Sequence, residues 1–328
     1  MTVRLVPGLV GLRALEEPWW DLWRRDPDAT PFHSPAWLLP WAETFQPETA
    51  LAVVACRDGR LDALLPLFRF EGRLIALGAG ITDHCGPLLD PGFDRLDELL
   101  AVVGGEGMPI DLPDLRGPLL EHPVPAGWAE ERWSCEPWPV LPLPATFSRS
   151  HRQNIRTSRN RAERLGPVTV ERVAGTAVLA ALEELTALHG ARWRTRGEEG
   201  VLADGAVAAF HALAAPALDR AGLLRLWRLR VGERPAALQY GISAKRRFHY
   251  YLGGFDPDLS HVSPGALLLA HGIAEATADG CAEFDFLRGA EPYKYCWGAV
   301  DRPGWGRRLL PSDASPRTTI DAAPPGSR

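Results

Sequence analysis

The sequence predicts an α/β protein made of two similar lobes, each built around a mixed sheet. The elements read from its hydrophobic periodicity follow the order β-α-α-β-β-β-α-β twice, once in each half. Two hairpin segments also correspond at a constant offset, because Gly59-Arg60 matches Glu233-Arg234 and Ala63-Leu64 matches Ala237-Leu238. A chain of 328 residues has the length of about two domains. We therefore expect lobes at 1–145 and 146–310, followed by a disordered tail at 311–328.

Strands in the first half are predicted from short β-rich runs, and helices from apolar residues at helical spacing. Asp58-Gly59 and Glu71-Gly72 are turn signals that separate three of the strands. A loop at Gly78–Pro91 and a Pro-rich linker at 141–147 complete this half. The expected elements are the strand Val3–Val6, the helices Leu12–Arg25 and Pro35–Phe45, the strands Leu51–Cys56, Leu61–Phe70 and Arg73–Leu77, the helix Arg95–Val103 and the strand Met108–Leu112.

The second half begins with an arginine-rich helix at Ser150–Leu165 and then repeats the same order. Gly232-Glu233 and Ala244-Lys245 are its tight turns. The expected elements are the strand Val168–Val173, the helices Thr176–Arg194 and Ala206–Arg220, the strands Leu224–Val231, Ala236–Ser243 and Phe248–Gly253, the helix Gly265–Asp279 and the strand Ala282–Phe286.

Composition excludes several classes of protein. The net charge of -5 argues against bulk electrostatic capture of nucleic acid, although a local basic patch remains open. No apolar run approaches the roughly 20 residues needed to span a bilayer. The five cysteines are scattered without a paired C-x-x-C spacing, which is typical of reduced thiols in a cytoplasmic protein. We expect neither a metal site nor a membrane span.

Six sequence segments carry a resemblance to a known family: TPFHSPAWL at 30–38, ITDHCGPLL at 81–89, SRSHRQNIRTSRNRAERLG at 148–166, YYLGGFDP at 250–257, SPGALLL at 263–269 and FDFLRGAEPYKYCWG at 284–298. The chain resembles, over roughly 30–300, the BioF2-like acetyltransferases. These are two-lobed GNAT (Gcn5-related N-acyltransferase) proteins that are associated with polysaccharide biosynthesis and related to Fem-type aminoacyl transferases. The resemblance implies a tandem GNAT fold and transfer of an acyl group from acetyl-CoA or another acyl-CoA to a small-molecule amine.

The start of the helix after residue 262 is the candidate donor site. Ser263 suits the N-cap, Pro264 the first helical position, and Gly265 and Ala266 present backbone N–H groups at the positive end of the helix. The resemblance places the coenzyme A pyrophosphate here, with Tyr251 nearby on the preceding strand. The usual Arg/Gln-x-x-Gly-x-Gly/Ala loop is replaced by LSHVSPGAL. The alternative interpretation is a well-capped helix without a ligand.

The segment that follows the last strand collects polar and charged side chains. Asp285 alternates with Phe284 and Phe286, so it should point to the opposite face of its strand. Arg288 or Lys294 could neutralise this carboxylate in a purely structural pair. The resemblance instead assigns Lys294, within Tyr293-Lys294-Tyr295, to stabilising an oxyanion. The candidate catalytic residues are Lys294, Asp83, Asp285 and Tyr293.

Candidate residues for binding the acceptor come from both lobes. The resemblance places the Asp83-His84 loop in a cleft between the lobes, where Asp83 would act as a base or orient the acceptor amine. The alternative is a local turn with a surface histidine. Strand alternation puts His249 and Tyr251 on one face and Tyr250 on the other. The candidate substrate-binding residues are His84, His249, Arg288 and Glu291.

The arginine-rich helix leaves other functions open. Ser150 and Gln153 suggest a capping box, and the arginines are Arg152, Arg156, Arg159, Arg161 and Arg164. A solvated cationic face is the simplest interpretation, and an anion-binding surface is the alternative. The main hypothesis is an acyl-CoA-dependent N-acyltransferase acting on a sugar, amino acid or cell-envelope precursor. Its rivals are an aminoacyl-tRNA-dependent Fem-like transferase, the one case in which nucleic acid is a partner, and a non-catalytic adaptor with the same fold.

Overall fold

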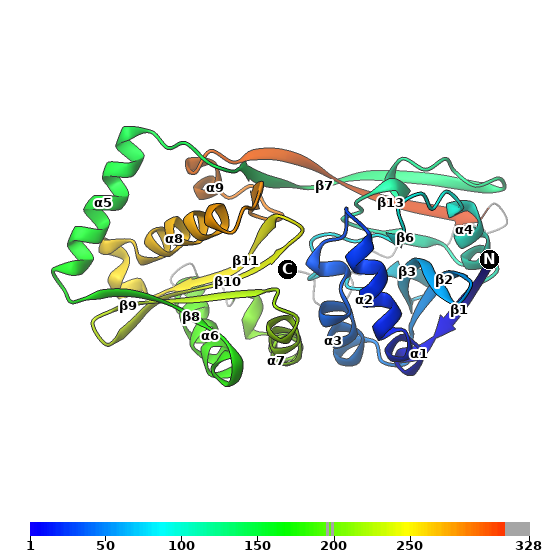
Figure 1. The fold of residues 1–328 in the computed structure, drawn as a ribbon, viewed down its shortest axis with the longest axis horizontal. Coiled ribbons are helices and arrows are strands. Elements are labelled where there is room, and N and C mark those ends of the chain that lie inside the picture. The colour runs from blue at the N-terminus through cyan, green and yellow to red at the C-terminus, as the bar shows by residue number, and fades with distance from the viewer. Residues whose placement is uncertain (195–196, 198–199, 312–328) are drawn as a thin grey trace. The chain divides into compact units, whose positions relative to one another are not determined.

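The computed structural model describes residues 1–194, 197 and 200–311. The tail that the sequence predicts therefore lies, beyond Pro311, outside the described residues. The chain divides into two compact units (Figure 1). Among the described residues, the first unit comprises Met1–Glu136 and Pro303–Pro311, and the second lies within Pro137–Arg302.

The first unit follows the predicted order. Its sheet runs β1-β2-β3-β4-β6-β13, and β4 and β6 are its parallel pair. The elements are β1 (Thr2–Pro7), α1 (Gly8–Ala14), α2 (Glu16–Arg25), η1 (Pro31–His33), α3 (Pro35–Phe45), β2 (Ala50–Arg57), β3 (Arg60–Phe70), β4 (Arg73–Ala76), β5 (Leu88–Leu89), α4 (Leu96–Gly104), β6 (Ile110–Leu112), η2 (Pro118–Leu120), and parts of β7 (Trp128–Pro142) and β13 (Val300–Pro311).

One prediction in this unit is wrong. The single helix expected over Leu12–Arg25 is two helices that meet at Leu15. The Leu15 N–H donates to the Leu12 carbonyl oxygen at 3.1 Å, which closes the first helix. Pro18 lacks a backbone N–H, so it fits the first turn of a new helix better than the interior of a long one.

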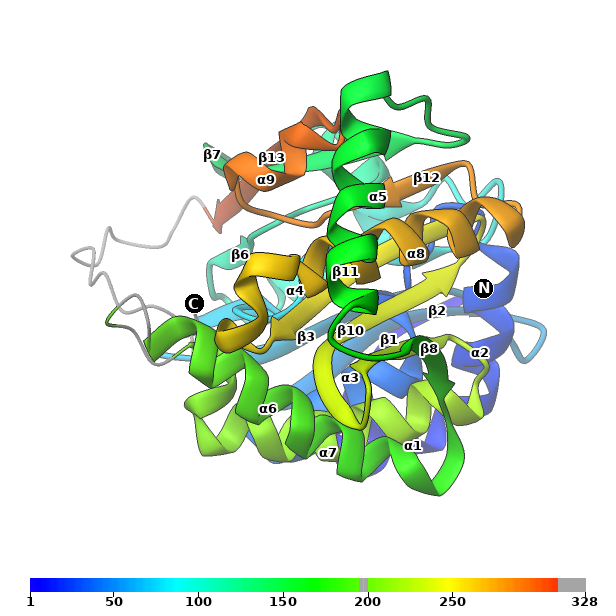
Figure 2. The ribbon, with the colours of Figure 1, turned by 90° about the vertical axis from the view of Figure 1, so that its left-hand side faces the viewer.

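The second unit repeats the plan, with the sheet order β7-β12-β11-β10-β9-β8 and the parallel pair β11 and β12. Helix α8 packs on one face of this sheet, and α6 and α7 cover the other (Figure 2). The elements are α5 (Arg149–Glu163), β8 (Val168–Val173), η3 (Gly175–Ala177), α6 (Val178–Arg194), η4 (Val201–Ala203), α7 (Gly205–Arg220), β9 (Leu224–Val231), β10 (Arg234–Ala244), β11 (Arg247–Phe255), η5 (Pro257–Val262), α8 (Pro264–Ala278), β12 (Glu283–Asp285) and α9 (Pro292–Cys296).

In each unit the last strand of the repeat pairs with a strand from a distant part of the sequence, and we call this arrangement a strand exchange. In the first unit β6 pairs with β13, which comes from the end of the described chain. In the second unit β12 pairs with β7, which directly follows the elements of the first. The exchange was not predicted, and the linker expected at 141–147 is wrong at its start, because Leu141 pairs with Phe284 and Pro142 with Glu283. The observed division after Glu136 therefore differs from the expected one after residue 145.

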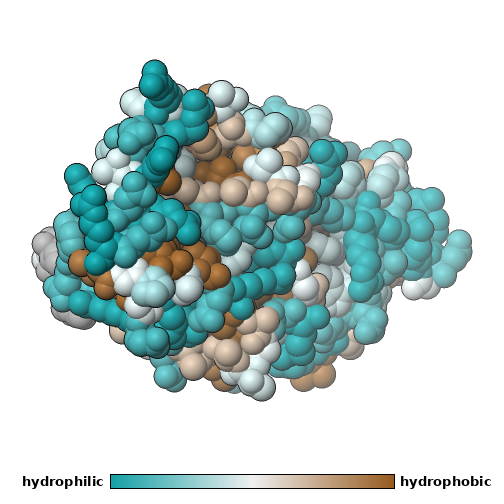
Figure 3. All heavy atoms as spheres, turned by 60° about the vertical axis from the view of Figure 1, so that its left-hand side comes forward, coloured by the Kyte–Doolittle hydropathy of each residue, from teal (hydrophilic) through white to brown (hydrophobic). Residues whose placement is uncertain are grey.

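Most of the face drawn in Figure 3 is hydrophilic, with smaller apolar patches. Within the described ranges, none of the helices is both long and apolar enough to cross a bilayer.

Candidate functional site

The parallel strands β11 and β12 part at their carboxyl ends. They pair over Arg247–His249 and Glu283–Asp285, after which β12 ends and β11 continues to Phe255. The register between β10 and β11 shifts at this level, so Tyr251 is the extra residue of a β-bulge. In α/β sheets, the carboxyl ends of parallel strands are where ligands bind when the neighbouring connections diverge. The side chains at this point are therefore the first candidates for chemistry.

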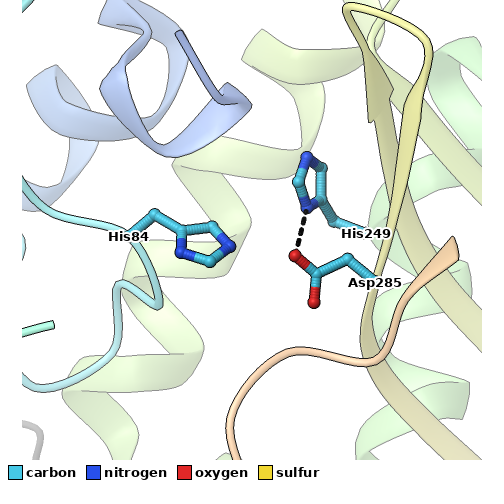
Figure 4. A group of neighbouring side chains, drawn as sticks. All are labelled: His84, His249 and Asp285. Atoms are coloured by element: carbon cyan, nitrogen blue, oxygen red, sulfur yellow. Dashed lines mark ion pairs between the residues drawn. The ribbon is translucent and has the colours of Figure 1, made fainter. Parts of the chain in front are cut away.

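His249 and Asp285 face each other where the strands part. The Nδ1 atom of His249 lies 3.7 Å from the Oδ2 atom of Asp285, and both side chains are fully buried (Figure 4). The second carboxylate oxygen, Oδ1, accepts a hydrogen bond of 2.8 Å from the Leu287 N–H. A carboxylate that is fixed from one side and faces an imidazole on the other can hold that ring in one orientation and stabilise its protonated form.

Lys294 fastens the loop that follows Asp285. Its Nζ atom donates to the carbonyl oxygens of Leu287 at 3.1 Å, Arg288 at 2.8 Å and Gly289 at 3.0 Å. It also forms an ion pair of 2.8 Å with Glu291, although Lys294 itself is only 2% exposed. An ammonium group has three N–H donors, so these partners use all of them. The sequence suggested Asp285 or a reacting carbonyl as the partner of Lys294, and these backbone contacts were not predicted.

Two further candidates border this loop. The ring of Tyr293, on α9, contacts Phe286 at 6.3 Å between centroids and packs against the core of the second unit. Arg288 contributes its backbone carbonyl to Lys294, and its side chain is half-buried. Tyr293 thus supports the loop from its apolar side.

The start of α8 matches the sequence prediction in position and differs in chemistry. Ser263 is the N-cap residue, but it has left-handed backbone angles and its side chain makes no capping hydrogen bond. The helical hydrogen bonds begin with Leu267 N–H to the Ser263 carbonyl oxygen at 3.1 Å, so the N–H groups of Gly265 and Ala266 precede them. A Cβ atom on Gly265 would lie 3.3 Å from the Phe255 ring, which gives this glycine a packing role.

Tyr251 points toward the helices on the other face of the sheet. Its ring contacts His211 of α7 at 5.3 Å and Tyr240 of β10 at 5.5 Å. Tyr250 instead contacts Phe284 and Phe286, which confirms that the two tyrosines lie on opposite faces. Burial raises the pKa of the Tyr240 phenol well above its ordinary value, so this hydroxyl stays neutral.

His211 and Tyr240 were not among the residues predicted from the sequence. For His211, the sequence does contain an indication that the side chain is buried. His211 sits at an apolar position of α7, among Val207, Phe210 and Ala214, and is 2% exposed. A histidine in the apolar stripe of an amphipathic helix is a polar group that must be buried, and such groups need a structural or functional explanation. His189 of α6 gives the same signal and contacts the Gly253 carbonyl oxygen at 3.3 Å.

Asp83 and His84 lie in the loop after β4, within the first unit. Both are fully buried, so the interpretation of His84 as a surface residue is wrong. The ring of Phe32 contacts His84 at 5.8 Å. The preceding Thr82 accepts a hydrogen bond of 2.8 Å from the indole N–H of Trp37. The loop is thus anchored to the segment that precedes and begins α3.

The arginine-rich helix is largely exposed. It begins at Arg149 and is capped by Ser148, whose Oγ accepts a hydrogen bond of 3.1 Å from the His151 N–H. The predicted capping box of Ser150 and Gln153 is therefore wrong. Arg159 forms an ion pair with Glu163 at 2.9 Å. The described contacts include no ion pair for the exposed residues Arg149, Arg156, Arg161 and Arg164.

Comparison with protein families finds one match, which covers this part of the chain. Residues 149–295 match the family described as Acetyltransferase (GNAT) domain. They include the parallel pair β11 and β12, the start of α8 and the His249–Asp285 pair. Over these residues the second unit is therefore similar to a GNAT acetyltransferase domain. No protein of curated function matches the sequence.

Solved structures extend the likeness to both units. FemX is 12% identical with a TM-score of 0.66, over 89% of this chain and 95% of that chain. The C-terminal domain of a putative lysylphosphatidylglycerol synthetase from Agrobacterium fabrum is 14% identical with a TM-score of 0.61, over 90% and 91%. L-PGS from Bacillus licheniformis is 13% identical with a TM-score of 0.60, over 91% and 92%. This chain shares the overall fold of these proteins across both of its units.

Proposed function

We propose that this protein is an N-acyltransferase that moves an acyl group from acetyl-CoA or another acyl-CoA to the amine of a sugar, amino acid or cell-envelope precursor. The observation that carries the proposal is the buried His249–Asp285 pair at the carboxyl ends of two parallel strands, inside the segment that matches a GNAT domain. A small-molecule amine is the acceptor class on which GNAT enzymes generally act.

The reaction needs a base and an oriented acceptor. The amine nitrogen attacks the thioester carbonyl carbon, a C–N bond forms, the C–S bond breaks and coenzyme A leaves as a thiolate. In our proposal His249 takes the proton that the amine loses, and Asp285 orients the imidazole and stabilises its charged form. Lys294 positions the loop after Asp285, because its donors already hold the carbonyl groups of Leu287, Arg288 and Gly289. Asp83, His84, Arg288 and Glu291 remain candidates for holding the acceptor.

The start of α8 is the candidate site for the pyrophosphate of the donor. The helix has 15 residues, and the N–H groups of Gly265 and Ala266 precede its first internal hydrogen bond. Unpaired N–H groups at the positive end of a helix bind phosphate. His261 is exposed on the preceding turn and could add a positive charge.

Release of coenzyme A from acetyl-CoA, measured across a panel of amino sugars and amino acids, tests the function. His249→Gln and Asp285→Asn should each lower kcat/KM by about 100-fold or more for the best acceptor. Surface residues His122 and Asp97 form another His–Asp contact, at 2.9 Å, and provide matched controls. His122→Gln and Asp97→Asn should leave the rate unchanged. Equal rates for all four variants would refute the proposed roles.

A second candidate is an aminoacyl-tRNA-dependent transferase, which the exposed arginines of α5 favour. A helix that presents several arginines can bind a phosphate backbone, and such binding weakens steeply with salt. The shift in melting temperature on adding coenzyme A or tRNA distinguishes the acyl-CoA donor from the aminoacyl-tRNA donor. Stabilisation by coenzyme A supports the acyl-CoA donor, whereas stabilisation by tRNA that is lost in an Arg149→Gln, Arg156→Gln double variant supports the alternative.

A further inference from the structure

The first unit contains a pocket that the proposed chemistry does not use. Three segments form it: the segment from the end of α2 to η1, the residues on both sides of β5, and the loop between β6 and η2. Its volume is about 210 Å³. At about 30 Å³ per water molecule in the liquid, this volume corresponds to roughly seven waters. The pocket is therefore smaller than typical drug-binding sites and suits a compact metabolite.

Hydrogen bonds fix the walls of the pocket. Asp26, which is 6% exposed, accepts from the Asp28 N–H at 2.8 Å and from the Leu89 N–H at 2.9 Å, so it ties the first segment to the second. The Arg116 N–H donates to the Cys85 carbonyl oxygen at 2.9 Å, which anchors the third segment. Because protein groups alone make these contacts, binding would require little ordering of the segments.

Prolines stiffen the same walls. The lining includes one or two from each segment, namely Pro27, Pro87 and Pro91 on either side of β5, and Pro118. Proline restricts its own φ angle and the conformation of the residue before it. The pocket is consequently a preformed cavity, and its shape can select a ligand.

Opposite charges line the pocket. Asp28 provides an exposed carboxylate, and Arg116 provides a half-exposed guanidinium. Asp90 also lines it, but its carboxylate already pairs with Arg25 and with Arg60. A carboxylate accepts several hydrogen bonds and a guanidinium donates five, so Asp28 and Arg116 can bind a ligand beside their existing contacts.

His33 adds a buried donor. Its Nδ1 atom accepts from the Thr30 N–H at 3.0 Å, so the neutral ring carries its proton on Nε2. His33 is 5% exposed and lines the pocket with Arg116, while Ala29, Leu89 and Phe93 supply apolar surface. The pocket thus combines an acceptor for a cation, two donors for an anion and a small apolar wall.

We propose that this pocket binds a small zwitterion with one ammonium and one carboxylate group, of the free α-amino acid class. The ammonium group lies toward Asp28, and the carboxylate lies toward Arg116 and His33. A short side chain of the ligand packs near Ala29 and Phe93. The site belongs to the first unit and is separate from the GNAT domain.

Isothermal titration of the full chain with glycine, L-alanine and L-serine tests this proposal. At least one of them should bind saturably, and acetate and methylamine should each bind about tenfold more weakly or worse, because each satisfies half of the site. Asp28→Asn and Arg116→Gln should each weaken binding about tenfold. The exposed pair Arg13 and Glu43 gives matched controls, Arg13→Gln and Glu43→Gln, which should bind as the unchanged protein does.

Several results would overturn the proposal: no saturable binding of any of the three amino acids, equal affinity for methylamine or acetate, or full affinity in both pocket variants. Circular dichroism checks that each variant folds. If Arg116→Gln does not fold, Asp28→Asn carries the test, because Asp28 is exposed. The readout is binding, so its failure would leave the acyl-transfer proposal untouched.

Discussion

The Nζ atom of Lys294 lies 3.1 Å from the carbonyl oxygen of Leu287, a residue with φ of +60°. Left-handed backbone angles are unfavourable for a branched side chain such as leucine. Asp285 holds the Leu287 N–H at 2.8 Å, so buried charged groups fix the backbone on both sides of this residue. Strained backbone conformations that are supported in this way are concentrated at functional sites. There they hold side chains and backbone groups in positions that an unstrained backbone would not give them.

Replacing Lys294 should loosen this loop. Lys294→Met keeps the length of the side chain and leaves three carbonyl groups, two of them buried, without their donor. We expect a loss of about 2–4 kcal/mol in the free energy of unfolding, measured by urea denaturation, together with a fall in acyl transfer. Glu291→Gln is the control for the free energy of unfolding alone, because Glu291 is exposed and its pair with Lys294 should contribute less than about 1 kcal/mol. Equal losses in the two variants would contradict the assigned role.

Arg307 should stabilise the first unit. It is fully buried on β13, pairs with Glu130 at 2.7 Å and donates to the Leu119 carbonyl oxygen at 2.5 Å. Arg307→Met should lower the free energy of unfolding by about 2–4 kcal/mol, since it leaves Glu130 and a buried carbonyl without this partner. Arg132→Gln removes the other arginine beside Glu130, but Arg132 is exposed, so its loss should stay below about 1 kcal/mol.

Removing β13 should unfold the first unit. A chain that ends at Arg302 lacks the strand that covers β6, so the edge of the sheet would be left open. We expect this chain to lose the near-ultraviolet dichroism signal of the tryptophans in the first unit and to aggregate. A chain that ends at Pro311 retains every described strand and should behave as the full protein does. Soluble, cooperative unfolding of the shorter chain would contradict this expectation.

His271 should make the stability of the second unit depend on pH. Burial lowers the pKa of this imidazole on α8, where it contacts the Trp227 ring at 5.4 Å. The unfolded chain then takes up its proton near pH 6.5, before the folded chain does, so stability falls as the pH drops below that value. Unfolding measured from about pH 7.5 to about pH 5 should show a shallower decline in His271→Gln than in the unchanged protein. His261→Gln, at an exposed position, should keep the original decline.

Local patterns in the sequence predicted most of the elements. The bounds of α3, β8 and β9 agree with the prediction, because apolar spacing and turn residues determine elements of this kind. The exchanged strands were missed, because β7 pairs with β12 across a long stretch of sequence and short-range periodicity carries no information about its partner. Likewise, the charge of Lys294 is visible in the sequence, but its backbone partners depend on how the loop after Asp285 turns back.

The sequence proposed the residues of the candidate site but not their geometry. Asp285 and His249 were both candidates, and the faces of the neighbouring aromatic residues follow the predicted strand alternation. His249 and Asp285 face each other because the parallel register of β11 and β12 pairs these two residues, which are 36 positions apart in the sequence. The Ser263 side chain fails as a cap because the backbone is left-handed there, and such an angle for a serine is not evident from its neighbours.

The exchanged strands also constrain how a protein of this kind can evolve. A duplicated gene whose halves each complete their own sheet can later separate into two genes, each encoding a domain that works alone. Here the sheet of the first half is completed by the last strand of the chain, and the sheet of the second half by a strand encoded at the middle. If the gene were split between its repeats, each product would lack the strand that completes its sheet. Selection for a folded protein therefore favours keeping the two halves in a single reading frame.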